Sequence, residues 1–147
     1  MKRDLKFERF YPHPPERVWK ALTDPDALAA WYMANDFKAE VGHKFTFHTD
    51  PGPGFDGTLY CEVILVDAPH ELAYSFIGGF MKRKTTVRWL LTAQNGGTLL
   101  RLEHTGFTGL TDAAVSFIIG SGWGRFLAQL PPLLDRLAQE ERSEPAK

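Results

Sequence analysis

Between Phe37 and about Phe107 the chain alternates apolar and polar residues with a period of two. Successive side chains of a β-strand point to opposite faces of a sheet, so this alternation predicts antiparallel strands with one buried face. Asn95-Gly96 adds a hairpin signal, because the two-residue turn that it favours requires positive φ. We predict strands near residues 37–41, 44–49, 57–66, 71–78, 83–93 and 98–105.

The segment before this region predicts one further strand and two short helices. Residues 5–11 partly alternate and are followed by prolines, which give a β-ladder no N–H donor. Pro15 suits the first turn of a helix over residues 15–22, where a missing N–H costs nothing. Asp24 and Pro25 then predict the N-cap and the first residue of a second short helix.

Apolar residues near the C-terminus recur at three- and four-residue steps and predict one face of a long helix. These residues are Trp123, Phe126, Leu127, Leu130, Leu134 and Leu137. The glycines of residues 120–124 are interpreted as the place where the start of this helix passes close to the sheet. Pro131 and Pro132 each remove a helical donor and clash with the preceding turn at a cost of ~3 kcal/mol or more. We therefore expect the helix to kink there, or to stop and restart.

Together these elements predict a single α+β domain over residues 1–140, followed by a frayed tail over residues 141–147. The chain has 147 residues, which is close to the commonest size of one domain. The expected architecture is a curved antiparallel sheet of about seven strands, two short helices and a long C-terminal helix. That helix is the natural cover for the buried face of the sheet.

Strand parity directs several large rings to the face that the last helix covers. Apolar walls with a few polar tips are typical of a ligand pocket, so we predict an internal cavity between sheet and helix. A completely filled aromatic core is the alternative, and the sequence pattern leaves both interpretations open. The candidate cavity residues are Trp31, Phe45, Phe47, Tyr74, Phe76, Trp89, His104, Phe107, Trp123, Phe126 and Leu127.

Cys61 is the only cysteine, so the chain cannot form an internal disulfide. A nucleophilic cysteine needs a nearby base and an electropositive setting. Parity instead places Cys61 on the inner face of its strand together with Leu59, Val63 and Leu65. We expect this thiol to be buried and inert.

The five histidines form no pair at metal-binding spacing and are joined by no cysteine or acidic cluster, so we predict no metal site. No nucleophile elbow or phosphate-binding loop is present, and we assign neither a cofactor nor catalytic residues. His104 points inward and is interpreted as a hydrogen-bonded core histidine. The alternative is that His104 and Tyr74 together polarise a bound substrate.

The charge balance argues against nucleic acid as a partner. The formal net charge is −1 and the isoelectric point is about 6.5, whereas phosphate binding normally needs a basic excess. No apolar run approaches the ~20 residues of a membrane-spanning helix, and no signal peptide is evident. We expect a cytoplasmic protein that does not insert into membranes. The expected partners are a small apolar ligand and, in a homodimer, a second copy of the chain.

Four motifs resemble one known family in their order and spacing. They are residues 15–25 with Leu28 and Trp31; Gly57 with Glu62 and residues 72–75; residues 102–107; and Gly122-Trp123 with Leu127 and Leu130. The chain resembles the activator-of-heat-shock-protein-ATPase homologues of the START-like (SRPBCC, birch-pollen-allergen-like) superfamily. The resemblance runs from the first predicted strand to about Leu130 and implies the helix-grip fold, with a cavity between the sheet and its long helix.

The resemblance implies several functions, among which a fold alone cannot choose. Similar proteins bind lipids or other apolar molecules, cyclise polyketides, sequester toxic metabolites, or assist a chaperone in the stress response. We predict non-catalytic binding or sequestration of a lipid, polyketide or aromatic molecule. A cyclase-, aromatase- or hydratase-like enzyme is the second hypothesis. A co-chaperone that stimulates a heat-shock ATPase is the third, because that role in the relatives depends on an additional domain for which 147 residues leave no room.

Overall fold

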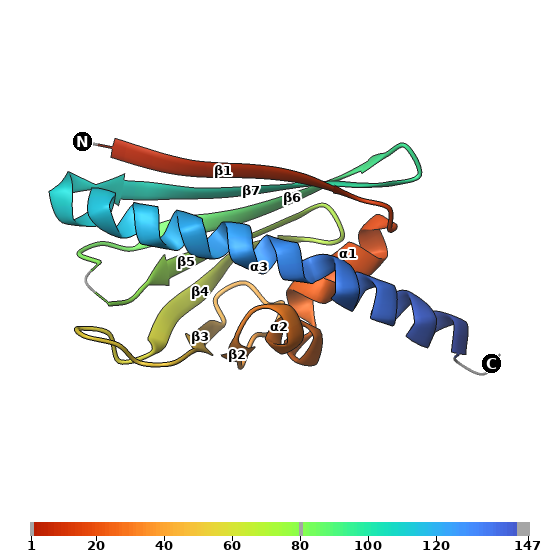
Figure 1. The fold of residues 1–147 in the computed structure, drawn as a ribbon, viewed down its shortest axis with the longest axis horizontal. Coiled ribbons are helices and arrows are strands. Elements are labelled where there is room, and N and C mark those ends of the chain that lie inside the picture. Colours follow the sequence, from red (N-terminus) through yellow and green to blue (C-terminus); the bar gives the residue numbers. More distant parts are fainter. Residues whose placement is uncertain (1, 80, 144–147) are drawn as a thin grey trace.

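The structure is a computed structural model that describes residues 2–79 and 81–143. Its centre is a seven-stranded antiparallel sheet, which confirms the predicted α+β architecture (Figure 1). In chain order the strands are β1 (Lys2–Tyr11), β2 (Ala34–Asn35), β3 (Lys44–His48), β4 (Thr58–Asp67), β5 (Glu71–Ile77), β6 (Thr85–Gln94) and β7 (Gly97–Thr108). Across the sheet their order is β1-β7-β6-β5-β4-β3-β2, so the first strand pairs with the last.

Two short helices follow β1 and lie beside the sheet, as the proline and capping signals predicted. They are α1 (Pro15–Thr23) and α2 (Pro25–Trp31). Asp24 caps α2, because its carboxylate accepts a hydrogen bond of 2.9 Å from the backbone N–H of Ala27. The indole N–H of Trp31 donates to the carbonyl of Ala21 at 2.7 Å and joins the two helices.

The third helix, α3 (Gly109–Ser143), lies across one face of the sheet (Figure 1). It starts well before the glycines that the sequence pattern placed near its beginning, so the interpretation of residues 120–124 as the helix start is wrong. Those glycines lie inside the helix. At Gly120 an added Cβ would approach Leu5 of β1 to 3.4 Å, which shows how closely the helix passes over the sheet.

The prolines at 131 and 132 do not interrupt α3, and the expected stop and restart is wrong. Pro131 removes the N–H that would bond the carbonyl of Leu127 in a regular helix. The hydroxyl of Tyr11 donates to that carbonyl instead, at 3.2 Å. The carbonyl that Pro132 leaves free belongs to Ala128, an exposed residue that water can reach.

The C-terminal part of α3 is held by polar side chains against α1 and the segment before it. The guanidinium of Arg17 donates to the carboxylate of Glu141 at 2.6 Å and 3.1 Å, and His13 lies 3.1 Å from Asp135. Residues 141–143, which we expected to fray, are therefore helical. The rest of the expected tail, residues 144–147, lies outside the described part of the chain.

The predicted faces of the strands are confirmed for most positions. Phe45 and Phe47 of β3 are buried, as are Val87, Trp89 and Leu91 of β6. Two bulges change the alternation elsewhere. In β4 the register shifts between Val63 and Leu65, so that Val66 lies opposite the buried Leu72 and packs on the core in place of the predicted Leu65. In β7, Gly106 has a φ of +101° and returns Phe107 to the face of His104.

The predicted strand over residues 37–41 is absent from the described structure, and a two-residue strand, β2, pairs with β3 in its place. Side chains explain the difference, because they compete with the ladder for backbone groups. The carboxylate of Asp36 accepts from the backbone N–H of Thr46 at 2.7 Å, and the amide oxygen of Asn35 accepts from that of Phe37 at 3.0 Å. Phe37 is nevertheless buried, with its ring centroid 5.0 Å from that of Phe45.

None of the described helices is both long and apolar enough to cross a membrane.

Candidate functional site

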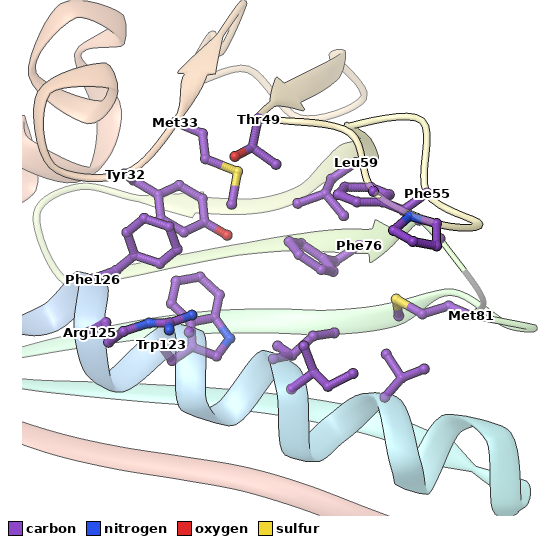
Figure 2. A pocket seen from close by; sticks show the side chains of 18 residues that line it. Tyr32, Met33, Thr49, Phe55, Leu59, Phe76, Met81, Trp123, Arg125 and Phe126 are labelled. Carbon is purple, nitrogen blue, oxygen red and sulfur yellow. The ribbon is translucent and has the colours of Figure 1, made fainter.

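An apolar pocket of about 440 Å³ lies between one end of the sheet and the N-terminal half of α3 (Figure 2). Its floor comes from β4 and β5, its walls from α3 and the residues after α2, and its rim from the loops before β4 and after β5. The lining residues are Tyr32, Met33, Thr49, Gly52, Pro53, Phe55, Leu59, Phe76, Gly78, Gly79, Met81, Val115, Ile118, Ile119, Gly122, Trp123, Arg125 and Phe126.

Tyr32 forms the wall at one end of this pocket. Its ring stacks on Trp123 with centroids 5.0 Å apart and planes 2° from parallel. The rings of Phe47 and Phe126 meet it edge-on at 4.8 Å and 4.6 Å. These aromatic pairs fix the orientation of the ring, and the hydroxyl points into the pocket (Figure 2).

The Tyr32 hydroxyl has no hydrogen-bond partner among residues 2–79 and 81–143. Burial, with smaller contributions from Tyr74 and Cys61, raises the pKa of this phenol well above its usual value. The group therefore stays protonated at neutral pH and can both donate and accept a hydrogen bond. It is one of the polar groups that a molecule in the pocket would meet, together with the side chains of Thr49 and Arg125 on the lining.

Two glycines shape the walls. A Cβ at Gly78 would lie 2.6 Å from a methyl of Leu59 and 2.9 Å from the carbonyl of Thr58, so the chain after β5 can pass over β4 only without a side chain. Gly122 on α3 is different, because a Cβ there would meet only Phe126, at 4.0 Å. The helix thus presents bare backbone to the pocket at a position that could hold a side chain.

The structure places the eleven predicted cavity residues in two groups. Phe76, Trp123 and Phe126 line the pocket. The other eight lie in the core around it rather than on its surface: Trp31, Phe45, Phe47, Tyr74, Trp89, His104, Phe107 and Leu127. Most of the predicted cavity residues therefore belong to the packed core, and three of them border the pocket at one end of it.

His104 is completely buried, and all of its polar atoms are used within the core. The indole N–H of Trp123 donates to Nδ1 at 3.0 Å. Nε2 lies 2.7 Å from the hydroxyl oxygen of Thr85, whose proton is donated to the carbonyl of Phe76 at 2.7 Å. These contacts specify a neutral imidazole with its proton on Nε2, and burial lowers the pKa of His104 to about 3.

Tyr74 and Cys61 are likewise enclosed. The Tyr74 hydroxyl accepts a hydrogen bond of 3.1 Å from the indole N–H of Trp89. Burial raises the pKa of both the Tyr74 phenol and the Cys61 thiol. Neither residue, nor His104, lines the pocket. The arrangement therefore offers a bound molecule no acid–base pair from Tyr74 and His104.

Within the described residues, no group of three or more His, Cys, Asp or Glu side chains is placed to hold a metal ion.

Sequence reasoning missed the residues that open the pocket. The helical spacing groups Tyr32 with Leu28 and Trp31 on one face, but it did not identify Tyr32 as a cavity residue. Met33 lies beyond the end of α2, where helical periodicity assigns no direction. The sequence pattern placed the start of the last helix near residues 120–124, so the earlier part of α3 was not assigned. That part contains Val115, Ile118 and Ile119. The glycine- and proline-rich residues 51–54 were a usable signal, because such a segment marks a loop tip that can form a rim.

Comparisons with known proteins agree with this fold. The family model described as "Activator of Hsp90 ATPase homolog 1-like protein" matches residues 12–135. The crystal structure of protein MLL2253 from Mesorhizobium loti is 35% identical, with a TM-score of 0.80 over 91% of this chain and 98% of that chain. A comparison with curated proteins gives no significant match.

Two further solved structures show the same fold at lower identity. CalU16 from Micromonospora echinospora is 24% identical, with a TM-score of 0.75 over 95% of this chain and 83% of that one. The Aha1 dimer from Colwellia psychrerythraea is 19% identical, with a TM-score of 0.75 over 90% and 96% of the two chains. At these identities the likeness concerns the fold alone.

Proposed function

The chain belongs to the family of Activator of Hsp90 ATPase homolog 1-like proteins, and from this premise we propose that it binds a small apolar molecule in the pocket beside Tyr32 without converting it. The observation that carries the proposal is the apolar pocket into which the Tyr32 hydroxyl points. That hydroxyl has no hydrogen-bond partner among the described residues. Concave apolar sites with few polar groups are the usual form of small-molecule sites. The volume of about 440 Å³ is within the range of such sites.

Binding rather than catalysis is proposed because the two residues considered as an acid–base pair, His104 and Tyr74, are already hydrogen-bonded to other core side chains. His104 is hydrogen-bonded to Thr85 and Trp123, and Tyr74 is hydrogen-bonded to Trp89. A general acid or base must reach the proton that it transfers, directly or through one water. Sequestration of a lipid, polyketide or aromatic molecule needs only the apolar walls and one hydrogen-bonding group.

Two glycines of α3 give a matched test. Gly122 lines the pocket, whereas Gly124 does not and has nothing within 4 Å of an added Cβ. Gly122→Leu and Gly124→Leu should each favour the helix by up to about 1 kcal/mol, since glycine is a poor helix former. Only Gly122→Leu places a side chain in the pocket.

The measurement is the binding of N-phenyl-1-naphthylamine, a neutral apolar probe whose fluorescence rises in apolar surroundings. We expect saturable binding to the wild type and to Gly124→Leu, and a loss of at least tenfold in affinity for Gly122→Leu. Equal binding by both variants, or no binding by the wild type, would overturn the proposed function.

Association of two copies of the chain stays a prediction. The relative from Colwellia psychrerythraea is a dimer, which supports a homodimer here. Sedimentation equilibrium across a range of protein concentrations measures the mass directly.

A further inference from the structure

The charge on the pocket lining is of one sign. Of the lining residues, Arg125 alone carries a formal charge, and no acidic side chain is among them. Arg125 is also the one charged residue of α3 between residues 113 and 134. Arg125 therefore places a guanidinium at the edge of an apolar pocket, on a stretch of α3 that carries no other charge.

The Arg125 guanidinium is available to a ligand. It forms no ion pair or hydrogen bond with any residue of the described ranges, and its side chain is exposed. Two other exposed arginines have carboxylate partners: Arg101 pairs with Glu8, and Arg88 pairs with Glu71. Within the described ranges Arg125 has no such partner, and neither do the exposed Arg83, Arg136 and Arg142.

The rim loop carries two acidic residues: Asp50, which is exposed and does not line the pocket, and Asp56, which is already engaged. One carboxylate oxygen of Asp56 accepts from the backbone N–H of Thr58 at 2.9 Å, and the other lies 3.3 Å from the hydroxyl of Tyr60 on the outer face. Asp56 does not line the pocket. The opposite rim carries Lys82 directly after the lining residue Met81, and the backbone N–H of Lys82 donates to the buried carboxylate of Asp112 at 3.1 Å. Asp112 does not line the pocket either.

The polar groups gather at one end of the pocket (Figure 2). Arg125 lies on α3 beside Phe126, toward the Tyr32 end, while Phe55 and Met81 lie toward the other end. The hydroxyl of Thr49 is on the rim between them. One end therefore offers a cation and the Tyr32 hydroxyl, and the other offers apolar surface.

From this arrangement we propose that the ligand is an apolar molecule with one acidic group, whose carboxylate pairs with Arg125 while its body fills the pocket. The inference rests on the proposed function, because it names the chemical class of molecule for the same site. A guanidinium presents several donors in a planar fork that matches the two oxygens of a carboxylate. The Tyr32 hydroxyl would hydrogen-bond a polar atom near the head of the ligand.

Three probes that differ only in their head group test the proposal: 6-phenylhexanoate, 6-phenylhexanol and 6-phenylhexylamine. Calorimetry at low ionic strength and pH 7.5 gives the Kd of each. We expect the acid to bind about fivefold more tightly than the alcohol, the usual upper worth of an ion pair at an exposed rim. The amine should bind most weakly, and the preference for the acid should shrink as salt is added.

Variants separate the roles of the two polar groups. Arg125→Gln should abolish the preference for the acid and leave the Kd of the alcohol unchanged. Arg136→Gln is the matched control, because Arg136 is exposed on the same helix and does not line the pocket. Tyr32→Phe should weaken the acid and the alcohol alike, since both can bond the hydroxyl.

The outcomes distinguish this inference from the function on which it rests. Equal Kd values for acid and alcohol in the wild type, with both probes excluded by Gly122→Leu, would overturn the acidic-ligand inference and support the pocket. A preference for the acid that survives Arg125→Gln would also overturn it. Failure of all three probes and of N-phenyl-1-naphthylamine to bind would overturn the proposed function itself.

Discussion

The hydroxyl of Tyr11, on the first strand, donates to the backbone carbonyl of Leu127, in the middle of the last helix. That carbonyl is the one that Pro131 deprives of its helical donor, and both Tyr11 and Leu127 are buried. A buried carbonyl without a partner costs free energy comparable to a lost hydrogen bond. The Tyr11 hydroxyl of β1 therefore supplies the hydrogen-bond donor that Pro131 removes from the helix.

The first prediction follows from this contact. Tyr11→Phe leaves the Leu127 carbonyl buried and unpaired, so it should lower the free energy of unfolding by about 1–3 kcal/mol. Pro131→Ala restores the helical N–H, and in that background the same change should cost clearly less. Urea denaturation of the four proteins measures the coupling. Additive effects would show that the hydroxyl does not substitute for the missing donor.

The second prediction concerns the charge state of His104. Burial lowers its pKa from 6.5 to about 3, so the unfolded chain takes up this proton first as the pH falls. The contribution of His104 to stability is therefore complete above about pH 6.5 and is lost progressively between pH 6.5 and 3. In this window it should add a slope approaching about 1.4 kcal/mol per pH unit to the free energy of unfolding.

Nitrogen-15 NMR of the imidazoles checks the same point without a mutation. The His104 resonances should keep the pattern of the Nε2-protonated neutral tautomer from pH 8 down to pH 5. A His104 signal that titrates near pH 6.5 would contradict the buried hydrogen-bond chain through Thr85.

A third prediction separates the two roles of Trp123, which packs on Tyr32 and donates to His104. Trp123→Ala should cost about 3–5 kcal/mol through lost contacts and a residual void. Trp123→Phe keeps a ring but leaves Nδ1 of His104 without its donor, so about 1–3 kcal/mol is expected. Denaturant midpoints give both values. An unchanged midpoint for Trp123→Ala would mean that the ring is not a core anchor.

The fourth prediction uses Cys61 as a reporter of opening. The thiol is buried and its pKa is raised, chiefly by burial, so little reactive thiolate is present near neutral pH. A disulfide reagent such as 5,5′-dithiobis(2-nitrobenzoate) should label the native protein slowly and the denatured protein at once. Complete labelling of the native protein within seconds would place Cys61 at an accessible surface.

Local periodicity was sufficient for much of the fold. The faces of β3 and β6 follow from alternation alone, because each residue's direction depends only on its neighbours along the strand. The same logic failed where backbone groups bond side chains, as at Asp36, whose carboxylate takes the N–H of Thr46. It also failed at Pro131, because the hydroxyl that donates to the free carbonyl of Leu127 belongs to Tyr11 of β1, which is distant in the sequence.

The candidate site was harder to predict than the fold. Strand parity identified Phe76 as an inward residue, and helical periodicity identified Trp123. Neither pattern distinguishes a ring packed inside the core from one that lines a pocket. That difference depends on how Tyr32 stacks on Trp123 and how closely the chain at Gly78 crosses β4. Arg125 carried no signal of its own, because a single arginine on a helix usually marks a solvated face.

The pairing of β1 with β7 has a consequence for how the chain folds. Of the seven strands, β1 is synthesised first, yet it can pair with β7 only after the other six have been made. This edge of the sheet therefore depends on pairing between residues very far apart in sequence. Proteins dominated by such distant contacts have high contact order and fold slowly. During synthesis on a ribosome, the backbone N–H and C=O groups of β1 would stay unpaired until β7 is made. The hairpins between β3 and β7 could form earlier, because each joins strands that are adjacent in sequence.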